Sequence, residues 1–247
     1  MTDWYKIKRV LIWQNWTEKQ IYPAGWKPWA NTVAYWTLDK DYPWWIITDE
    51  SWNWRELGWG HMSWYANPTI ATLWWVNCFE FTDGWYLFPH SWDFSLFSWK
   101  QAITISVWVY ITQFNWWAFN VLFSLWNTNH NSFTAYYDNS SIRLTDYWSD
   151  LTASAISLNT WLNLIFTAEA NSNTWKICVN GVEQTTSWWV SSYAWISWSN
   201  FNINRFFWDG GAFWIRWYMS NFIIENIERS AAQKLSYYNQ TKWNYGL

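Results

Sequence analysis

The chain has 247 residues, of which 51% are hydrophobic and 13% are charged, and its formal net charge is -3 at pH 7. These values exclude the basic surface of a nucleic-acid-binding protein and an acidic interaction tail. The longest apolar run, residues 103–111, is too short and too polar to cross a membrane. We therefore expect one large or two smaller globular β domains, with no membrane span and no nucleic-acid partner.

The N-terminal segment predicts a β-hairpin over residues 1–22 and a linker over residues 23–32. Strand-like runs flank Asn15-Trp16, and the linker contains two prolines. No apolar stretch follows the charged residues among the first ten, so we expect no secretory signal peptide. The localisation stays open, with a cell surface and a virion as the two alternatives.

Short runs rich in Val, Ile, Phe, Tyr and Thr dominate the chain from residue 33 onward, as is typical of β-strands. Turn residues separate these runs at roughly the 8–12-residue spacing of a β-sandwich. In the run 103–111, Ile103 and Ile105 alternate with Thr104 and Ser106, and both faces are largely apolar or aromatic. This pattern predicts a central strand inside two packed sheets. The predicted strands are 33–39, 76–81, 85–89, 102–111, 119–125, 132–138, 141–147, 161–170, 176–181, 201–207 and 217–226.

One helix is predicted near the C-terminus. Ser230 and Gln233 have the spacing of a capping box, in which each side chain satisfies a backbone N–H of the other residue. Leu235 with Tyr237 or Tyr238 supplies a small apolar face. The sequence therefore predicts an all-β protein with one short C-terminal helix.

Tryptophan is in excess and glycine is short, with 32 Trp and only 8 Gly, whereas average usage of about 7% Gly would give roughly 17. Many tryptophans stand at turns: Asn15-Trp16 lies where Asn-Gly would be a strong hairpin signal, as it is at Asn180-Gly181. We interpret such tryptophans as UGA codons, decoded as glycine in some lineages. The alternative is a chain that is truly rich in tryptophan. Tandem tryptophans occupy predicted loops at 74–75, 116–117 and 188–189.

Five segments in order resemble the laminin-G-like, concanavalin A-like lectin/glucanase jelly roll. The first is 33–39 with the turn from Asp49 to Trp54, in which Trp52 and Trp54 stand at the family's two glycine positions. The resemblance covers about 33–240 and implies a two-sheet antiparallel jelly-roll sandwich over 33–247. The other four segments are 76–89, 103–110, 158–184 and 213–240.

The resemblance also identifies individual positions. Trp36, Trp108 and Trp161 fall where the family itself has tryptophan, so we interpret these three as genuine. The family often carries acidic residues in its closing strand, where this chain has Ser220 and Asn221. This departure puts a catalytic role in doubt.

Catalytic residues are not evident. Retaining glucanases of this fold carry Glu-x-Asp-x-x-Glu on one strand, with two carboxyl groups about 5–5.5 Å apart, and the chain has no such triplet. We expect Glu225 and Glu228 to be a solvated strand end rather than a catalytic pair, and Asp146 and Asp150 to be solvated around a turn. The three histidines are isolated in the sequence and lack the spacing of zinc ligands: His61, His90 and His130.

The two cysteines, Cys78 and Cys178, lie far apart on strand-like runs. This placement favours two small buried hydrophobic residues over a disulfide between them. With no catalytic constellation and no zinc-ligand spacing, we expect no enzymatic activity.

Binding is the remaining class of function. Asp49, Ser51 and Asn53 offer oxygen ligands in one turn and predict a candidate calcium site. The alternative, which the residue types favour, is an Asx-turn whose hydrogen bonds hold the loop. The segment 136–141 is a candidate for sugar stacking, with a plain surface hairpin as the favoured alternative.

Two hypotheses about function follow from these observations. The first is a non-catalytic carbohydrate-binding or adhesion module, whose partner is a glycan or surface polysaccharide. The second is a structural or attachment component of a cell-surface or phage-type particle, with the jelly roll as a display domain. The resemblance favours the first hypothesis, and the missing secretory signal favours the second.

Overall fold

A computed structural model describes the chain from residue 31 onward, apart from several loops. The predicted N-terminal hairpin and residues 23–30 of the predicted linker lie outside the described residues. The described ranges are 31–40, 46–51, 53, 55–61, 69–81, 85–89, 102–113, 120–126, 132–138, 141–145, 150–153, 156–169, 174–184, 200–204 and 216–247.

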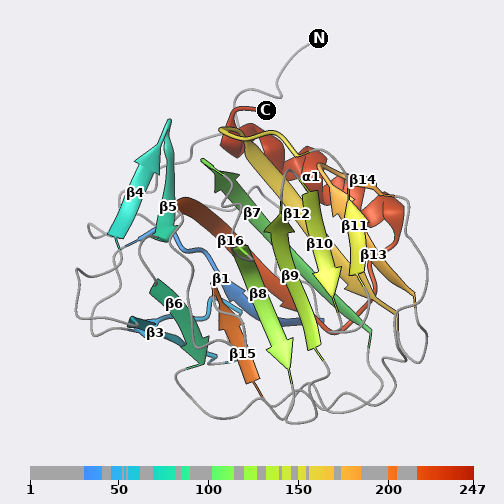
Figure 1. Ribbon diagram of the computed structural model, residues 1–247, viewed down its shortest axis with the longest axis horizontal. Coiled ribbons are helices and arrows are strands. Elements are labelled where there is room, and N and C mark those ends of the chain that lie inside the picture. The colour runs from blue at the N-terminus through green and yellow to red at the C-terminus, as the bar shows by residue number, and fades with distance from the viewer. Residues whose placement is uncertain are drawn as a thin grey trace, which may run out of the picture.

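The described strands form two sheets of eight strands each, and every pairing is antiparallel (Figure 1). The order in sheet A is β14-β13-β12-β7-β16-β5-β4, with β1 also paired to β16. Its strands are β1 (Thr32–Trp36), β4 (Thr69–Leu73), β5 (Val76–Phe81), β7 (Ile103–Ile111), β12 (Trp161–Ala168), β13 (Trp175–Val179), β14 (Val182–Glu183) and β16 (Trp217–Glu225).

Sheet B has the order β11-β10-β9-β8-β15-β6-β3-β2. Together the two sheets make the predicted all-β jelly-roll sandwich, and the short C-terminal helix is also present. The strands of sheet B are β2 (Ile46–Ile47), β3 (Leu57–His61), β6 (Trp85–Pro89), β8 (Asn120–Trp126), β9 (Ser132–Asp138), β10 (Ser141–Thr145), β11 (Asp150–Ala153) and β15 (Asn200–Ile203).

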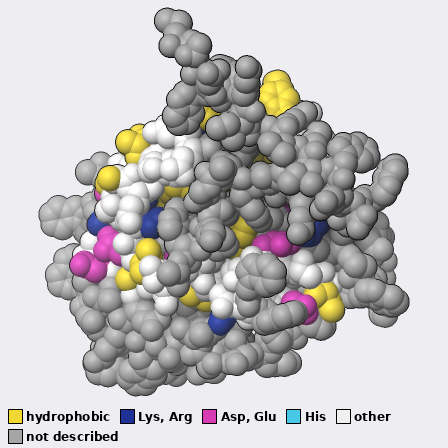
Figure 2. Space-filling model, turned by 180° about the vertical axis from the view of Figure 1, so that it is seen from behind, with side chains coloured by type: hydrophobic (Ala, Val, Ile, Leu, Met, Phe, Trp, Pro, Cys, Tyr) yellow, Lys and Arg dark blue, Asp and Glu magenta, His cyan; other side chains and the backbone are white. Residues whose placement is uncertain are grey.

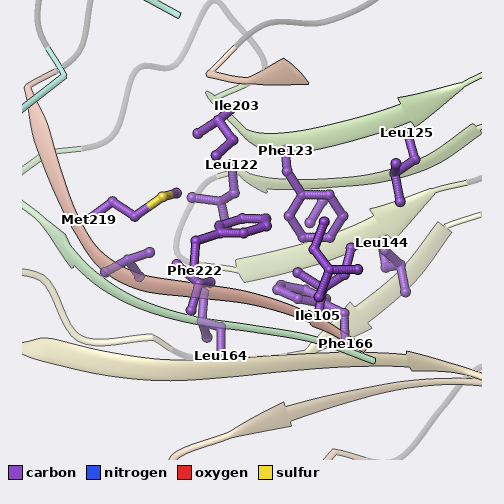
Figure 3. Close-up of a cluster of buried hydrophobic side chains, with 14 of the residues drawn as sticks. Ile105, Leu122, Phe123, Leu125, Leu144, Leu164, Phe166, Ile203, Met219 and Phe222 are labelled. Carbon is purple, nitrogen blue, oxygen red and sulfur yellow. The ribbon is translucent and has the colours of Figure 1, made fainter. Parts of the chain in front are cut away.

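The core fills the space between the two sheets. Figure 3 shows Phe123 and Leu125 of sheet B facing Ile105 and Phe166 of sheet A across the interior, and the rings of Phe123 and Phe166 meet edge to face at 5.2 Å. Strand β7 lies between β12 and β16, which confirms the prediction of a central strand. Its isoleucines and valines belong to this core, whereas Trp108 points to the opposite face of sheet A. Successive side chains of β7 therefore alternate between the core that separates the two sheets and the outer face of sheet A.

Helix α1 (Ala231–Thr241) packs on the outer face of sheet A beside β14 (Figure 1). The capping box between Ser230 and Gln233 is confirmed. The predicted apolar face is correct for Tyr237, which is buried, and wrong for Leu235, which is 45% exposed. Lys234 takes the inward position instead, and its buried ammonium contacts the hydroxyl of Thr167 at 3.1 Å.

The three tryptophans interpreted as genuine are buried: Trp36, Trp108 and Trp161 each have 3% or less of their surface exposed. The β4–β5 turn is different, because Trp74 and Trp75 are 75% and 62% exposed. Trp74 has a φ of 65°, the left-handed region that favours glycine. A positive φ at the first central residue of a two-residue hairpin is the type II′ pattern, in which glycine is the usual residue. The UGA interpretation stays a prediction, and its other turns with tryptophan lie outside the described residues: Trp16, Trp52, Trp54, Trp116, Trp117, Trp188 and Trp189.

Candidate binding surface

The outer face of sheet B is lined by polar side chains across β9, β10 and β11. The inward residues of these strands, such as Phe133, Ile142 and Leu151, belong to the core. Because successive side chains point to opposite faces, the residues between them face outward. The strand register places one polar residue of each of five strands in a single cross-strand row: Asn202, Ser124, Thr134, Thr145 and Asp150. The first four are buried, so the row reaches solvent only at Asp150.

Arg143 lies at the centre of this surface, on β10. One terminal nitrogen of its guanidinium is 3.1 Å from Oδ2 of Asp150 on β11, and the other is 3.2 Å from Oδ2 of Asp138 on β9. The hydroxyl of Tyr136 donates a hydrogen bond of 2.8 Å to the same oxygen of Asp150. We call these four residues the Arg143 cluster. Three neighbouring strands therefore hold one cation between two carboxylates.

Solvent reaches the charged part of this cluster. The side chains of Arg143, Asp138 and Asp150 are 34%, 24% and 34% exposed. Tyr136 is 3% exposed, and burial together with its hydrogen bond to Asp150 raises the pKa of its phenol well above the usual range. The tyrosine therefore stays a neutral donor that fixes one carboxylate, and the surface presents an ordered array of donors and acceptors.

The predicted sugar-stacking role of 136–141 is wrong for the two tyrosines of β9, because Tyr136 and Tyr137 are buried. The favoured alternative is correct, since β9 and β10 pair as a hairpin in which Asp138 lies opposite Ser141. Asp150 is exposed, as expected, and it also pairs with Arg143. The cluster itself was not predicted, because its members come together only through the register of three strands.

The Asp49 loop is held against β1 by hydrogen bonds. Oδ1 of Asp49 accepts from the backbone N–H groups of Tyr35 at 2.9 Å and Ser51 at 2.8 Å. Oδ2 accepts from the hydroxyl of Ser51 at 2.8 Å and from the backbone N–H of Arg55 at 3.1 Å. The side-chain amide of Asn53 donates to the carbonyls of Thr32 and Val33.

These contacts are the ones expected of an Asx-type turn, the favoured alternative for this loop. The Asp49 carboxylate accepts two bonds on each oxygen, so a calcium ion would have to replace some of these donors. In the ranges that the structure describes, no three His, Cys, Asp or Glu side chains come together as a metal site. Calcium binding by Asp49, Ser51 and Asn53 stays a prediction.

Glu225 and Glu228 do not form the expected solvated strand end. Glu225 is fully buried and pairs with Arg229, which is 2% exposed. Burial, opposed by Arg229, raises the pKa of Glu225 to about 7. Glu228 is half-buried and lies 2.6 Å from the ammonium of Lys176. The expectation was wrong because α1 covers the end of β16. The guanidinium of Arg229 lies over the ring of Tyr237 on α1, 5.0 Å from its centroid.

Ser220 and Asn221 lie at a fork in sheet A. On one side β16 pairs with β7 along its length, and on the other it pairs first with β5, up to Met219, and then with β1, from Phe222 onward. The register with β7 shifts between Ser220 and Ile223, and Asn221 has a φ of 53°. Asparagine tolerates this left-handed conformation better than most residues. The register shift is a β-bulge, and its backbone conformation explains why asparagine stands at position 221.

The two fork residues form a neutral hydrogen-bond network. Asn221 accepts from the hydroxyl of Tyr35 at 2.6 Å and donates to Ser220 and to the hydroxyl of Tyr245. Ser220 donates to the carbonyl of Thr37. Tyr245 belongs to the 3₁₀-helix that follows α1 (Lys242–Tyr245), and its ring stacks on Trp108 at 3.9 Å. These residues join β1, β16 and the C-terminus, a role that an amide and a hydroxyl fulfil without charge.

Both cysteines are free and buried, which confirms their interpretation as small buried residues. Burial raises the pKa of the Cys78 thiol to about 12 and that of Cys178 to about 11, so both stay protonated. Asp146, His90 and His130 lie outside the described residues, as does the side chain of His61. None of the helices in the described part of the chain is long and apolar enough to span a membrane.

On one face of the molecule, the charged side chains of the described residues are mixed. On the face shown in Figure 2, acidic and basic side chains lie next to one another rather than in separate patches. A second surface cluster, on the outer face of sheet A, pairs Arg216 with Glu80 and places the guanidinium 5.7 Å from the ring centroid of Tyr218. This Arg216 cluster resembles the Arg143 cluster in composition but contains only one carboxylate.

No family model and no curated protein matches the chain. Solved structures with a similar fold include botulinum neurotoxin type C, described as depending on two ganglioside molecules for cell entry (TM-score 0.64, 13% identity, covering 85% of this chain and 51% of that chain). The receptor-binding domain of botulinum neurotoxin type G gives a TM-score of 0.63 with 13% identity over 85% of this chain and 51% of that chain. The binding domain of botulinum neurotoxin DC, in complex with rat synaptotagmin II, gives 0.60 with 14% identity and the same coverage.

This chain spans about half the length of those neurotoxin chains. At 13–14% identity, the similarity shows a shared fold.

Proposed function

We propose that the protein is a non-catalytic carbohydrate-binding or adhesion module whose ligand contacts the Arg143 cluster. The observation that carries the proposal is this ordered set of one guanidinium and two carboxylates, half-exposed on the outer face of a jelly roll. Sugar hydroxyls both donate and accept hydrogen bonds, so a surface that offers fixed partners of both kinds suits them.

The cluster is organised before any ligand arrives. Arg143 is held by Asp138 on one side and Asp150 on the other, and Tyr136 fixes Asp150 from below the surface. Side chains that are already ordered lose little conformational freedom on binding, which favours affinity. The backbone pairing of β9, β10 and β11 sets the spacing between the charged groups.

The absence of catalysis is part of the proposal. Glu225 and Glu228 each pair with a separate cation, Arg229 and Lys176, and these pairs hold the C-terminal segment against sheet A. A retaining glycosidase would instead need two carboxyl groups facing one another across a sugar. The carboxylates of Asp138 and Asp150 do not face one another in this way, because Arg143 lies between them and pairs with both.

The similar structures support a binding role by analogy. One neurotoxin is described with two ganglioside molecules, and another binding domain is in complex with a protein, synaptotagmin II. The protein complex favours a second candidate function, an attachment component of a cell-surface or phage-type particle whose jelly roll contacts a protein receptor.

A glycan array with the full chain tests the first candidate. We expect binding to a subset of glycans, weakened about 10- to 100-fold by Arg143→Ala, because a hydrogen bond to a charged group contributes about 1.5–3 kcal/mol. Arg216→Ala is the matched control, since it removes an arginine–carboxylate pair from the other outer face. Binding of no glycan, or equal losses in both variants, would contradict the proposal.

A further inference from the structure

We infer that the Arg143 cluster selects glycans without acidic groups, an inference that rests on the proposed function. The cluster contains two carboxylates and one guanidinium, so its formal charge is negative. In the described part of the chain, no other Lys or Arg forms an ion pair with Asp138 or Asp150.

The cluster also offers two carboxylate oxygens as acceptors to a ligand. Both terminal nitrogens of Arg143 are directed at carboxylates, each at its Oδ2 atom. No hydrogen bond or ion pair between described residues uses Oδ1 of Asp138 or Oδ1 of Asp150. These two oxygens belong to partly exposed side chains, so they favour a ligand that brings hydrogen-bond donors to them.

Sugar hydroxyls supply such donors, whereas an ionised carboxylate or sulfate supplies only acceptors. An acidic sugar would also place a third negative group within a few ångström of two others, and like charges at that distance repel even near a surface. Among the described residues, the cross-strand neighbours Ser141, Thr145 and Thr152 are uncharged hydroxyl side chains and leave this balance unchanged.

The preference for a class of glycan distinguishes this inference from the proposed function. A site that bound acidic sugars would be expected to leave a guanidinium free for bidentate pairing. Here each terminal nitrogen of Arg143 already faces a carboxylate of the protein itself.

Matched glycan pairs provide the test: a neutral oligosaccharide that binds on the array, and the same oligosaccharide carrying a sialic acid or a sulfate. We expect the acidic member to bind about tenfold more weakly at low salt. This gap in affinity between the two members should be smaller at high salt, because salt screens the repulsion. Asp150→Asn removes one charge at nearly constant shape and should narrow the gap. Glu80→Gln, in the Arg216 cluster, is the control and should leave it unchanged.

Equal or tighter binding of the acidic members would overturn the inference while leaving the proposed function intact. Binding of neither member would overturn the proposed function itself. If Asp150→Asn does not fold, Asp138→Asn removes the other carboxylate and makes the same prediction. A gap that neither variant changes would show that the two carboxylates do not set specificity.

Discussion

Two arginine–carboxylate groups in this molecule share their chemistry and differ in burial. Arg229 and Glu225 lie between the end of β16 and α1, with exposures of 2% and 0%. Arg143 lies on the outer face of sheet B, where it and its two aspartates keep between 24% and 34% of their side-chain surface in contact with solvent. The first group connects helix to sheet, whereas the second is partly exposed to solvent.

Burial changes what each group contributes. Breaking a buried pair by removing one partner leaves an uncompensated charge and costs about 3–5 kcal/mol. An exposed pair contributes about 0–1 kcal/mol, because water solvates both charges well. We therefore expect the Arg229 group to matter for stability and the Arg143 cluster to matter for binding, with little overlap between the two effects.

The largest effect should come from Arg229→Ala. This change leaves Glu225 buried without its cation and removes the guanidinium from the ring of Tyr237. We expect a loss of about 3–5 kcal/mol in the free energy of unfolding, measured by urea denaturation. Arg143→Ala is the matched comparison, with an expected loss of about 1 kcal/mol or less. Equal losses would show that burial does not separate the two groups.

Asp49→Ala should have the next largest effect. It removes the acceptor of four hydrogen bonds, one from Tyr35 on β1 and three from Ser51 and Arg55 in the loop itself, so we expect a loss of about 2 kcal/mol in the free energy of unfolding. Thermal melting with and without calcium gives the second readout. A rise in Tm with calcium that the variant abolishes would support the predicted site, and an equal loss in both conditions would assign Asp49 to the turn alone.

Trp74→Gly should raise stability by about 1–2 kcal/mol, because a residue with a side chain pays that much for a left-handed φ. Trp75→Gly is the control: Trp75 has no positive φ, and its indole N–H donates to the carbonyl of Asn244 at 3.1 Å. Chemical denaturation of both variants measures the difference. A loss of stability in Trp74→Gly would count against glycine at this position, as would a genuine UGG codon.

Local patterns predicted much of the fold. Alternation in 103–111 predicted the central strand, and the spacing of Ser230 and Gln233 predicted the start of the helix, because both signals act over a few residues. The strand-like runs and their turn residues predicted the class of sandwich. These features depend on the backbone and on neighbouring side chains in the sequence.

The candidate site could not be predicted in the same way. The Arg143 cluster requires a particular register between β9, β10 and β11, which sets which outward residues become neighbours. The burial of Glu225 requires α1 to fold back over sheet A, a tertiary contact that no pattern around Glu225 contains. The sequence pattern predicted a strand at 141–147 but did not single out Arg143, because the aspartates that flank it lie on other strands.

An NMR titration of the full chain with the strongest glycan from the array tests the binding surface most directly. The proposal predicts that backbone amide shifts concentrate in β9, β10 and β11 around Tyr136, Arg143 and Asp150, and that Arg143→Ala removes them. Shifts concentrated at the Asp49 loop or at the sheet A fork, with the amides of β9 to β11 unchanged, would contradict it.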